Sequence, residues 1–371
     1  MSNIQIAGDS QQDQLHLGAV VPSQYHLKFS DSFIEWMNEI NSSIVFTTYE
    51  AGKIVMVGPS TGKARFAVSE RSFGRAMAMA MTDDGFLLSI QHQLWRFQNC
   101  LKEDTITQDG WDRIFLPRQC HVTGGVDVHD IALDKHNKLM AVITLYNCVA
   151  QLDHRGNFNP VWKPEFIDRV INEDRCHLNG FCLVKDEVKY VTIVSASNTP
   201  NGWREHRADG GQVIDITTNK VIASGLAMPH SPRFYKNKLW ILEAGTGWFG
   251  WINIKTGEFN KVAWVPGFAR GLRFYGDYAL VGISKPRHEI FSGLPLDDEL
   301  KNRGREPEAG IYLINIKTGD VHATMNISGS VGEIYDVGVI PGSRAPFLAG
   351  TTGIEDKKMI FIGPDLTAEK L

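Results

Sequence analysis

Three histidines occupy equivalent positions in three successive segments of the chain. His129 begins HDIAL, His177 begins HLNGF and His230 begins HSPRF. Three imidazole nitrogens brought to one point can bind a divalent ion and leave a coordination position open, which is typical of catalytic rather than structural sites. Zinc and iron(II) both accept these ligands, and affinity alone does not choose between them. The sequence therefore predicts a divalent metal, Zn or Fe, held by these three residues.

Three further segments align with the histidine segments. They are RAMAM from Arg75, RGLRF from Arg270 and YDVGV from Tyr335. Arginine offers fixed charge and paired donors, which suit a carboxylate or phosphate on a substrate. Tyr335 can donate a proton, or accept one if a metal and the arginines depress its pKa. Glu333 is a candidate fourth ligand or base, so we predict Arg75, Arg270, Tyr335 and Glu333 as catalytic residues.

Metal-bound histidines generally donate their second ring N–H to a carboxylate or a carbonyl. Three carboxylates lie close enough in sequence to take this role, namely Asp127, Asp130 and Asp174. His230 also stands between Pro229 and Pro232. Because the residue before a proline avoids helical geometry, Pro232 predicts an extended backbone at Ser231. The prolines therefore favour a stiff support for this imidazole.

Recurring hairpins supply the elements that must position these residues. The chain has 35 glycines, and WINIKTGEFNKVAWVPG at 251–267 is echoed by YLINIKTGDVHATMNISG at 312–329. Each reads as strand, turn and strand. Two more strand candidates precede each hairpin, and four antiparallel strands make a propeller blade. Since the first strand of each blade lines the central channel, the six aligned residues are predicted to face one axis.

The two ends of the chain leave the number of blades open. Residues 43–70 supply three strands without a first one, after a predicted helix at DSFIEWMNEIN. The C-terminal PFLAGTT and KMIFIG supply two more. We therefore predict an all-β, six- or seven-bladed β-propeller with a short N-terminal helix. The predicted domains are a polar N-terminal tail over 1–30 and a single propeller over 31–371.

Two long inter-strand insertions interrupt the repeats at 197–211 and 285–310, the second with a predicted short helix at LDDELKNRG. Loops of this length in a compact domain are usually functional or disordered. Their Trp203, Arg204, Lys285 and Arg287 would suit a lid over a site.

Composition excludes some classes of partner. Lys and Arg total 38 against 42 Asp and Glu, and no basic cluster of the kind that binds nucleic acid is present. No segment has the roughly 18 apolar residues of a membrane span, and the N-terminus lacks a secretory signal. Five cysteines without a C-x-x-C pair favour reduced thiols. We expect a cytoplasmic protein that binds a small-molecule or peptide substrate, with no nucleic acid and no membrane.

Several long segments carry a resemblance to a known family. HVTGGVDVHDIAL, EDRCHLNGF, NGWREHRADGGQVIDI, MPHSPRFY and FSGLPLDDEL resemble an uncharacterised bacterial family, a domain of unknown function, from about Phe33 onward. The resemblance implies a propeller-like cytoplasmic protein and brings no activity. The predicted site is similar in chemistry to the three-His zinc site of peptidyl-hydroxyglycine amidating lyases, and in kind to the four-His iron site of carotenoid-cleaving oxygenases. The sequence motifs of both families are missing.

Two functions from different classes remain open. The first is a metal-dependent lyase, hydrolase or oxygenase that acts in the channel. The second is a non-catalytic binding or scaffold propeller whose working surface is a rim that carries Trp203, Trp248 and the two insertions. In the second case the channel histidines only make structural hydrogen bonds. A parallel α/β fold is disfavoured, because few helix-period segments separate the strands.

Overall fold

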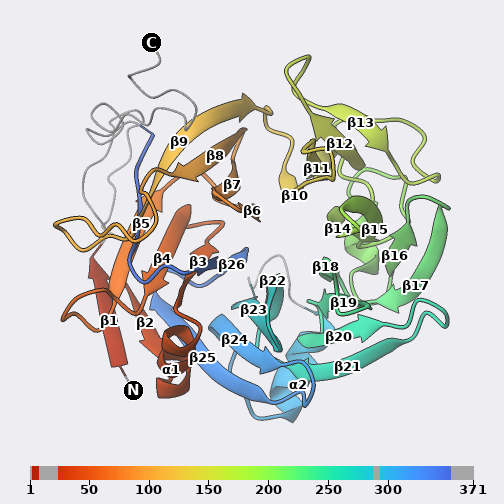
Figure 1. Cartoon of the computed structure of the whole chain (residues 1–371). Coiled ribbons are helices and arrows are strands. Elements are labelled where there is room, and N and C mark those ends of the chain that lie inside the picture. Colours follow the sequence, from red (N-terminus) through yellow and green to blue (C-terminus); the bar gives the residue numbers. More distant parts are fainter. Residues whose placement is uncertain (1, 8–23, 287–292, 352–371) are drawn as a thin grey trace.

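Six β-sheets are arranged around a central axis in the computed structural model, which describes residues 2–7, 24–286 and 293–351 (Figure 1). Each sheet is one blade, with its strands ordered outward from the axis. The protein is therefore mainly β, a six-bladed β-propeller with two short helices, as the recurring hairpins predicted.

Three blades are built from four consecutive strands each, written here from the innermost outward. Blade 3 contains β10 (Val128–Leu133), β11 (Leu139–Ile143), β12 (Cys148–Leu152) and β13 (Asn159–Trp162). Blade 4 contains β14 (Leu178–Val184), β15 (Glu187–Ile193), β16 (Gly211–Asp215) and β17 (Lys220–Leu226). Blade 5 contains β18 (Pro229–Tyr235), β19 (Lys238–Glu243), β20 (Trp248–Ile252) and β21 (Phe259–Trp264). The innermost strands carry the three aligned histidine segments.

The ring closes in blade 1, which combines the two ends of the chain. The innermost strand, β26 (Val337–Pro341), pairs antiparallel with β3 (Ser42–Thr47), and β4 (Lys53–Gly58) and β5 (Ala67–Ser72) follow. The strands predicted over residues 43–70 therefore complete blade 1 of a six-bladed ring and do not form a seventh blade.

Blade 2 has an additional outer strand. It contains β6 (Met79–Thr82), β7 (Gly85–Ile90), β8 (Gln93–Asn99), β9 (Arg113–Val122) and β27 (Pro346–Leu348). β27 pairs parallel with β9, so the predicted PFLAGTT strand joins blade 2 and not the C-terminal unit. The predicted KMIFIG strand lies outside the described residues.

Blade 6 is extended by the N-terminal segment. It contains β22 (Phe268–Tyr275), β23 (Tyr278–Ser284), β24 (Ala309–Asn315), β25 (Val321–Gly329), β2 (Gln24–Phe29) and β1 (Ser2–Ala7). The predicted polar tail over 1–30 needs correction, because β2 pairs with β25. Tyr25, Leu27 and Phe29 alternate along β2 and are fully buried. At least this strand belongs to the propeller.

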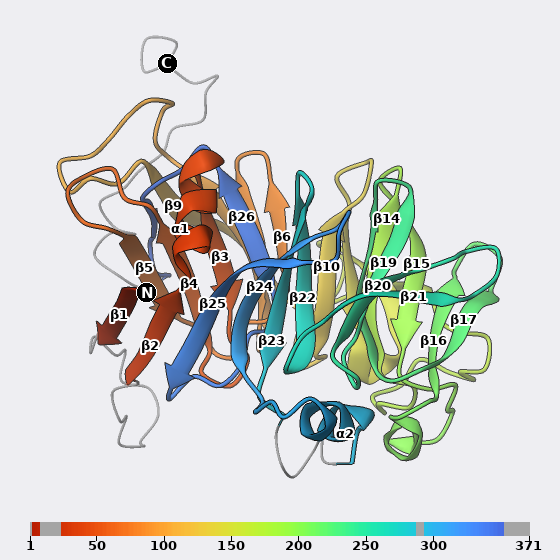
Figure 2. The same ribbon diagram turned by 90° about the horizontal axis from the view of Figure 1, so that it is seen from below.

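Both predicted helices are present. α1 (Asp31–Glu39) begins after Ser30, whose hydroxyl accepts a hydrogen bond from the Phe33 N–H, and it buries one apolar face. α2 (Pro295–Asn302) lies in the second insertion, below the ring in Figure 2. Two 3₁₀ turns, η1 (Thr144–Tyr146) and η2 (Gly202–His206), complete the helical elements. Within the described residues, neither helix is long and apolar enough to cross a membrane.

A side-chain hydrogen bond joins each blade to the next near the beginning of the innermost strand. Four hydroxyls donate to backbone carbonyls: Thr47 to Met77 at 2.6 Å, Ser89 to Val128 at 3.3 Å, Thr144 to Leu178 at 2.8 Å and Ser284 to Ile334 at 3.0 Å. The last two bonds run from the Asn179 amide to the Pro229 carbonyl at 3.1 Å and from the Gly271 N–H to Ser231 Oγ at 3.2 Å. Because unsatisfied buried donors and acceptors are costly, these bonds fix the inner strands relative to one another.

Candidate functional site

The three aligned histidines meet where the innermost strands begin. The ring centroids of His129 and His177 are 5.0 Å apart, and those of His129 and His230 are 6.5 Å apart. The Tyr335 ring lies 6.0 Å from both His129 and His230. The structure therefore brings these four side chains from blades 1, 3, 4 and 5 into one cluster, called here the histidine cluster.

Each imidazole of the cluster is held through Nδ1. The contacts are His177 to Asp174 Oδ2 at 2.7 Å, His129 to the Asp127 carbonyl oxygen at 3.2 Å and His230 to Ser231 Oγ at 2.9 Å. The three Nε2 atoms make no hydrogen bond with the residues that the structure describes. The Asp127 carbonyl and the Asp174 carboxylate can only accept, so Nδ1 of His129 and His177 carries the proton and their Nε2 lone pairs are available to a ligand. The Ser231 hydroxyl orients the His230 ring and is compatible with either tautomer.

Burial sets the charge state of the cluster. It lowers the pKa of His129, and Arg270 contributes to the same effect. Burial followed by the charge of Arg270 holds the pKa of His230 well below its usual range. Burial also raises the pKa of Tyr335 well above its ordinary value, and its hydroxyl donates to the His129 carbonyl oxygen at 2.9 Å. Both histidines are therefore neutral near pH 7, and Tyr335 is suited to donate a proton and not to accept one.

The first insertion covers the histidine cluster. Trp203, in η2, stacks on His177 with ring centroids 4.2 Å apart and donates from Nε1 to Asp174 Oδ2 at 2.9 Å. The guanidinium carbon of Arg204 lies 4.4 Å from the Trp203 ring. Trp203 is only 2% exposed, so it closes this end of the channel and does not form an exposed rim.

The second insertion packs against the first. Leu294, Leu296 and Leu300, in and beside α2, share one apolar cluster with Trp203. Of the other predicted lid residues, Lys285 donates its backbone N–H to the Gly332 carbonyl at 2.9 Å, and Arg287 lies outside the described residues. The two insertions thus meet at the same end of the channel.

Two arginines lie at the edge of the histidine cluster. Arg75 Nη2 is 3.6 Å from Asp127 Oδ1, and its guanidinium carbon is 4.4 Å from the Tyr49 ring. The Arg270 guanidinium carbon is 5.7 Å from the Tyr335 ring. Positive charge therefore reaches the site from blades 2 and 6, which lie on either side of blade 1.

The structure gives less support to Glu333 as a fourth ligand and to the three histidines as a metal site. Glu333, on the loop before β26, is buried, and its Oε1 accepts the backbone N–H of Glu50 in the turn between β3 and β4. This described contact faces backbone and not an imidazole. Among the described residues, no group of three or more His, Cys, Asp or Glu side chains is arranged to hold a metal ion. The metal site and the role of Glu333 stay predictions.

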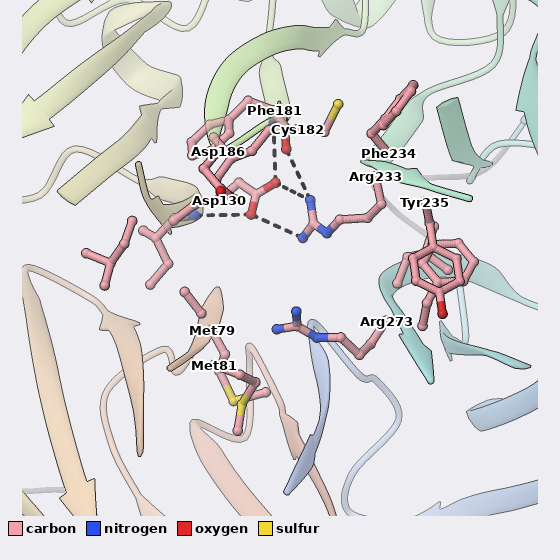
Figure 3. Close-up of a pocket in the computed structure, with 17 residues that line it drawn as sticks. Met79, Met81, Asp130, Phe181, Cys182, Asp186, Arg233, Phe234, Tyr235 and Arg273 are labelled. Carbon is pink, nitrogen blue, oxygen red and sulfur yellow. Dashed lines mark hydrogen bonds and ion pairs between the residues drawn. The ribbon is translucent and has the colours of Figure 1, made fainter. Parts of the chain in front are cut away.

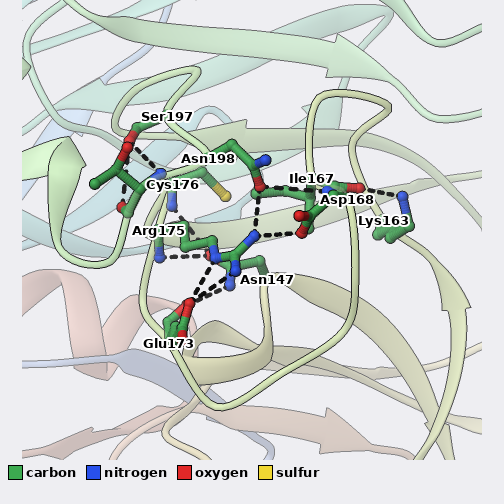
Figure 4. A network of polar contacts seen from close by, with 10 residues as sticks. Asn147, Lys163, Ile167, Asp168, Glu173, Arg175, Cys176, Ser197 and Asn198 are labelled. Carbon is green, nitrogen blue, oxygen red and sulfur yellow. Dashed lines mark hydrogen bonds and ion pairs between the residues drawn. The ribbon is translucent and has the colours of Figure 1, made fainter.

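A polar network holds the loop that leads to His177 (Figure 4). The buried Arg175 guanidinium donates to Asp168 at 2.5 Å, Asn198 at 2.6 Å and Glu173 at 2.9 Å. Asn147 Oδ1 accepts the backbone N–H groups of Arg175 and Cys176 at 2.9 and 3.0 Å. These five hydrogen bonds anchor the residues immediately before His177 and leave it little freedom to move.

Unusual backbone geometry recurs where the innermost strands begin. Positive φ angles occur at Arg75 (52°), Asp127 (58°), His177 (49°) and Ser231 (49°), and at Gly271 (70°). Residues other than glycine rarely adopt this region, and such outliers gather at functional sites. The pairing also shifts register near the beginning of β10, β14, β18 and β22. A bulge of this kind re-aims side chains, which is how the strands present their first residues to the axis.

A second layer of charged residues lies farther along the same strands, and sequence reasoning did not identify it as a site. It consists of Asp130, Arg233, Arg273 and Asp336. Asp130 was predicted to support a histidine, but its carboxylate pairs with Arg233 at 2.8 Å. A signal was present, because Arg233 and Arg273 occupy the fourth position of HSPRF and RGLRF.

Comparison with known proteins identifies the family. The model of a domain of unknown function, DUF4915, matches residues 31–349. The chain belongs to the DUF4915 family. The predicted membership in a family of unknown function is thereby confirmed. No protein with a curated description matches this DUF4915 chain.

Several solved structures are similar to the DUF4915 chain at low identity. A protein of unknown function from Bacteroides caccae is 12% identical with a TM-score of 0.44, and the match covers 81% of this chain and 98% of that one. A chain of the nidogen/laminin complex is 10% identical with a TM-score of 0.46, covering 81% and 99%. A catalytically inactive virginiamycin B lyase from Staphylococcus aureus, solved with quinupristin, is 11% identical with a TM-score of 0.39, covering 82% and 99%. These neighbours include an enzyme, and none of them assigns an activity to the DUF4915 chain.

Proposed function

We propose that this DUF4915 protein is a metal-dependent enzyme, a lyase, hydrolase or oxygenase, that acts on a small anionic or peptide-like substrate at the histidine cluster. One observation carries the proposal. Each of His129, His177 and His230 uses Nδ1 against a protein oxygen and keeps Nε2 without a partner among the described residues. Histidines that bind metal are generally supported in this way.

The ring separations fit a metal in part. With metal–nitrogen bonds of about 2 Å, the centroids of two imidazoles on one tetrahedral ion lie about 5 Å apart. The 5.0 Å between His129 and His177 meets this value. The 6.5 Å between His129 and His230 exceeds it, so binding would draw His230 inward by about 1 Å. Zn and Fe both remain suitable ions.

The other residues of the cluster have matching roles. Arg75 and Arg270 would hold an anionic group of the substrate, and Tyr335 would donate a proton. Trp203 covers His177, which keeps bulk water from this side of the cluster. A bound ion would act as a Lewis acid or lower the pKa of its water to about 7. Glu333 remains a candidate base.

A cytoplasmic location is part of the same proposal. All five cysteines are free thiols, and three of them are buried, namely Cys148, Cys176 and Cys182. Free thiols suit a reducing compartment. The slight excess of acidic residues favours a small substrate over nucleic acid as the partner.

Metal content tests the proposal directly. Tag-free protein is incubated with Zn(II) or Fe(II), freed of excess metal and subjected to elemental analysis, and about one equivalent should remain bound. His177→Ala should lose it, whereas His136→Ala should not, because His136 is an exposed turn residue outside the cluster. A content below about 0.2 equivalents for both metals, or equal contents in the two variants, would contradict the proposal.

The alternative, a non-catalytic propeller that binds through its rim, has less support. Trp203 is buried against His177, and Trp248 is half-buried and donates from Nε1 to Glu299 Oε1 at 3.3 Å. Both aromatic residues assigned to the rim are thus used inside the molecule. Metal-free protein whose partner capture survives His177→Ala would favour this alternative.

A further inference from the structure

The other end of the channel contains a separate cavity of about 450 Å³ (Figure 3). It lies between the far ends of β6, β10, β14, β18 and β22, and its 17 lining residues include none of the three clustered histidines. Most of the lining residues are apolar, among them Met79, Met81, Phe181 and the stacked rings of Tyr235 and Phe274, whose centroids are 4.5 Å apart, while polar atoms form slightly more of the exposed wall than apolar atoms do. The volume is in the range of small-molecule sites.

One charged pair in the wall is already satisfied. Arg233 Nη1 and Nη2 contact Asp130 Oδ2 and Oδ1 at 2.8 and 3.2 Å, and Nη1 also donates to the Phe181 carbonyl at 3.2 Å. The nearby Asp336 accepts the backbone N–H groups of Met79 and Val337 at 2.8 and 2.9 Å. These groups have little left to offer a ligand.

Arg273 differs from Arg233. Its Nε is shielded from solvent without a hydrogen-bond partner, and its guanidinium makes no hydrogen bond or ion pair with the residues that the structure describes. In Figure 3 the guanidinium extends from β22 toward the space between Met79 and the Asp130–Arg233 pair. Burial lowers the pKa of Arg273, and the charges of Asp336 and Asp130 offset this only in part. A protein retains such a charge at a cost in stability, and a bound anion would remove that cost.

We propose that this cavity binds a small monocarboxylate with an apolar or aromatic tail, its carboxylate paired with Arg273. A planar guanidinium matches a carboxylate through two parallel hydrogen bonds. A single charge is favoured because Asp130 and Asp336 line or adjoin the same space and would repel a dianion. The methionine and aromatic walls provide apolar contact for the tail. The inference is independent of the proposed function, since it uses no residue of the histidine cluster.

Isothermal titration of the full chain with 3-phenylpropionate tests the proposal. We expect saturable binding that Arg273→Met weakens by at least about tenfold, because a charge-assisted pair is lost. The free Arg273→Met protein should also unfold at a higher temperature than the unaltered protein, since a half-buried charge without an ion-pair partner among the described residues is removed. A purely structural arginine would give the opposite shift. His177→Ala should bind as the unaltered protein does, which separates this site from the metal proposal.

A second variant covers the case in which Arg273→Met does not fold. Ala132→Phe places a ring in the cavity wall and should also weaken binding of 3-phenylpropionate. Three results would each overturn the proposal. They are an affinity in both variants equal to that of the unaltered protein, no saturable binding in the unaltered protein, or tighter binding of phenyl phosphate or 3-phenylpropylamine than of 3-phenylpropionate.

Discussion

Replacing Asp130 by Asn should destabilise the propeller through a buried ion pair that connects three blades. Asp130 on blade 3 contacts Arg233 on blade 5 through both carboxylate oxygens, at 2.8 and 3.2 Å. Its Oδ2 also accepts the backbone N–H of Phe181 on blade 4 at 3.3 Å. The two charged side chains are 6% and 23% exposed, so neither charge is well hydrated.

The magnitude follows from the charge that would remain. Burial lowers the pKa of Arg233, and Asp130 more than offsets this and raises it overall. Removing one member of a buried pair costs about 3–5 kcal/mol. Because Arg233 is partly exposed, the expected loss in the free energy of unfolding is about 3 kcal/mol. Replacing both members by apolar residues is close to neutral, so Asp130→Leu with Arg233→Met should lose much less than the sum of the two single changes.

Urea unfolding followed by tryptophan fluorescence measures these losses. The control is the exposed ion pair between Lys135 and Glu187, at 2.5 Å, which also connects blades 3 and 4. Glu187→Gln should change the free energy of unfolding little, because exposed pairs are screened by water and salt. An Asp130→Asn loss no larger than that of the control would refute the reasoning, and so would additive losses in the double variant.

Three further predictions use the same unfolding assay. Burial raises the pKa of Asp336 from 3.8 to about 6. Its contribution to stability is therefore full below about pH 4 and falls by up to about 3 kcal/mol as pH rises through 6. Asp336→Asn should abolish this dependence of the unfolding free energy on pH, and an unchanged dependence would contradict the prediction. Gly271→Ala should lower the melting temperature more than Gly276→Ala, because at φ 70° its Cβ would lie 2.8 Å from the Asp336 Cα, whereas Gly276, at φ 61°, faces open space. Equal shifts would exclude this steric explanation. Asp174→Ala should lower the free energy of unfolding by about 2–4 kcal/mol, since the Trp203 indole and the His177 imidazole both lose their acceptor. A loss below about 1 kcal/mol would show that neither donor is left unsatisfied.

The sequence predicted the placement of the histidine cluster because the blade repeat fixes it. His129, His177 and His230 were aligned by their positions within recurring hairpins and by their shared polar first residue, and each lies at the beginning of an innermost strand. The number of blades could not be predicted in the same way. β26 and β3 pair across almost the whole chain, and nothing local in either strand indicates its partner.

The polar tail illustrates a signal that was present but not interpreted. QYHLKF alternates apolar and polar residues, which is the period of a half-buried strand. Its partner β25 lies about 300 residues away in sequence, so a single short alternating segment at the N-terminus could not be matched to a sheet.

Ser231 shows tertiary contacts outweighing a local preference. Pro232 predicts an extended backbone for Ser231, yet its φ is 49°. In this conformation Ser231 Oγ contacts His230 Nδ1 at 2.9 Å and accepts the Gly271 N–H from the next blade at 3.2 Å. The prediction of an extended Ser231 is therefore wrong, because one of the two hydrogen bonds that override the local preference involves Gly271, 40 residues away.

The bulges near the beginning of the innermost strands explain why a single strand can serve both ends of the channel. In β18 the regular pairing passes from His230 directly to Arg233, and in β22 it passes from Arg270 to Leu272. The skipped Ser231 and Gly271 are the two residues that bond to each other across blades 5 and 6. A skipped residue leaves the strand ladder, so its polar groups are free to bond with the neighbouring blade. The same bulge therefore aligns the histidine cluster and determines where Arg233 and Arg273 lie along their strands. The geometry of the two sites is thus coupled through the backbone and not through a shared side chain.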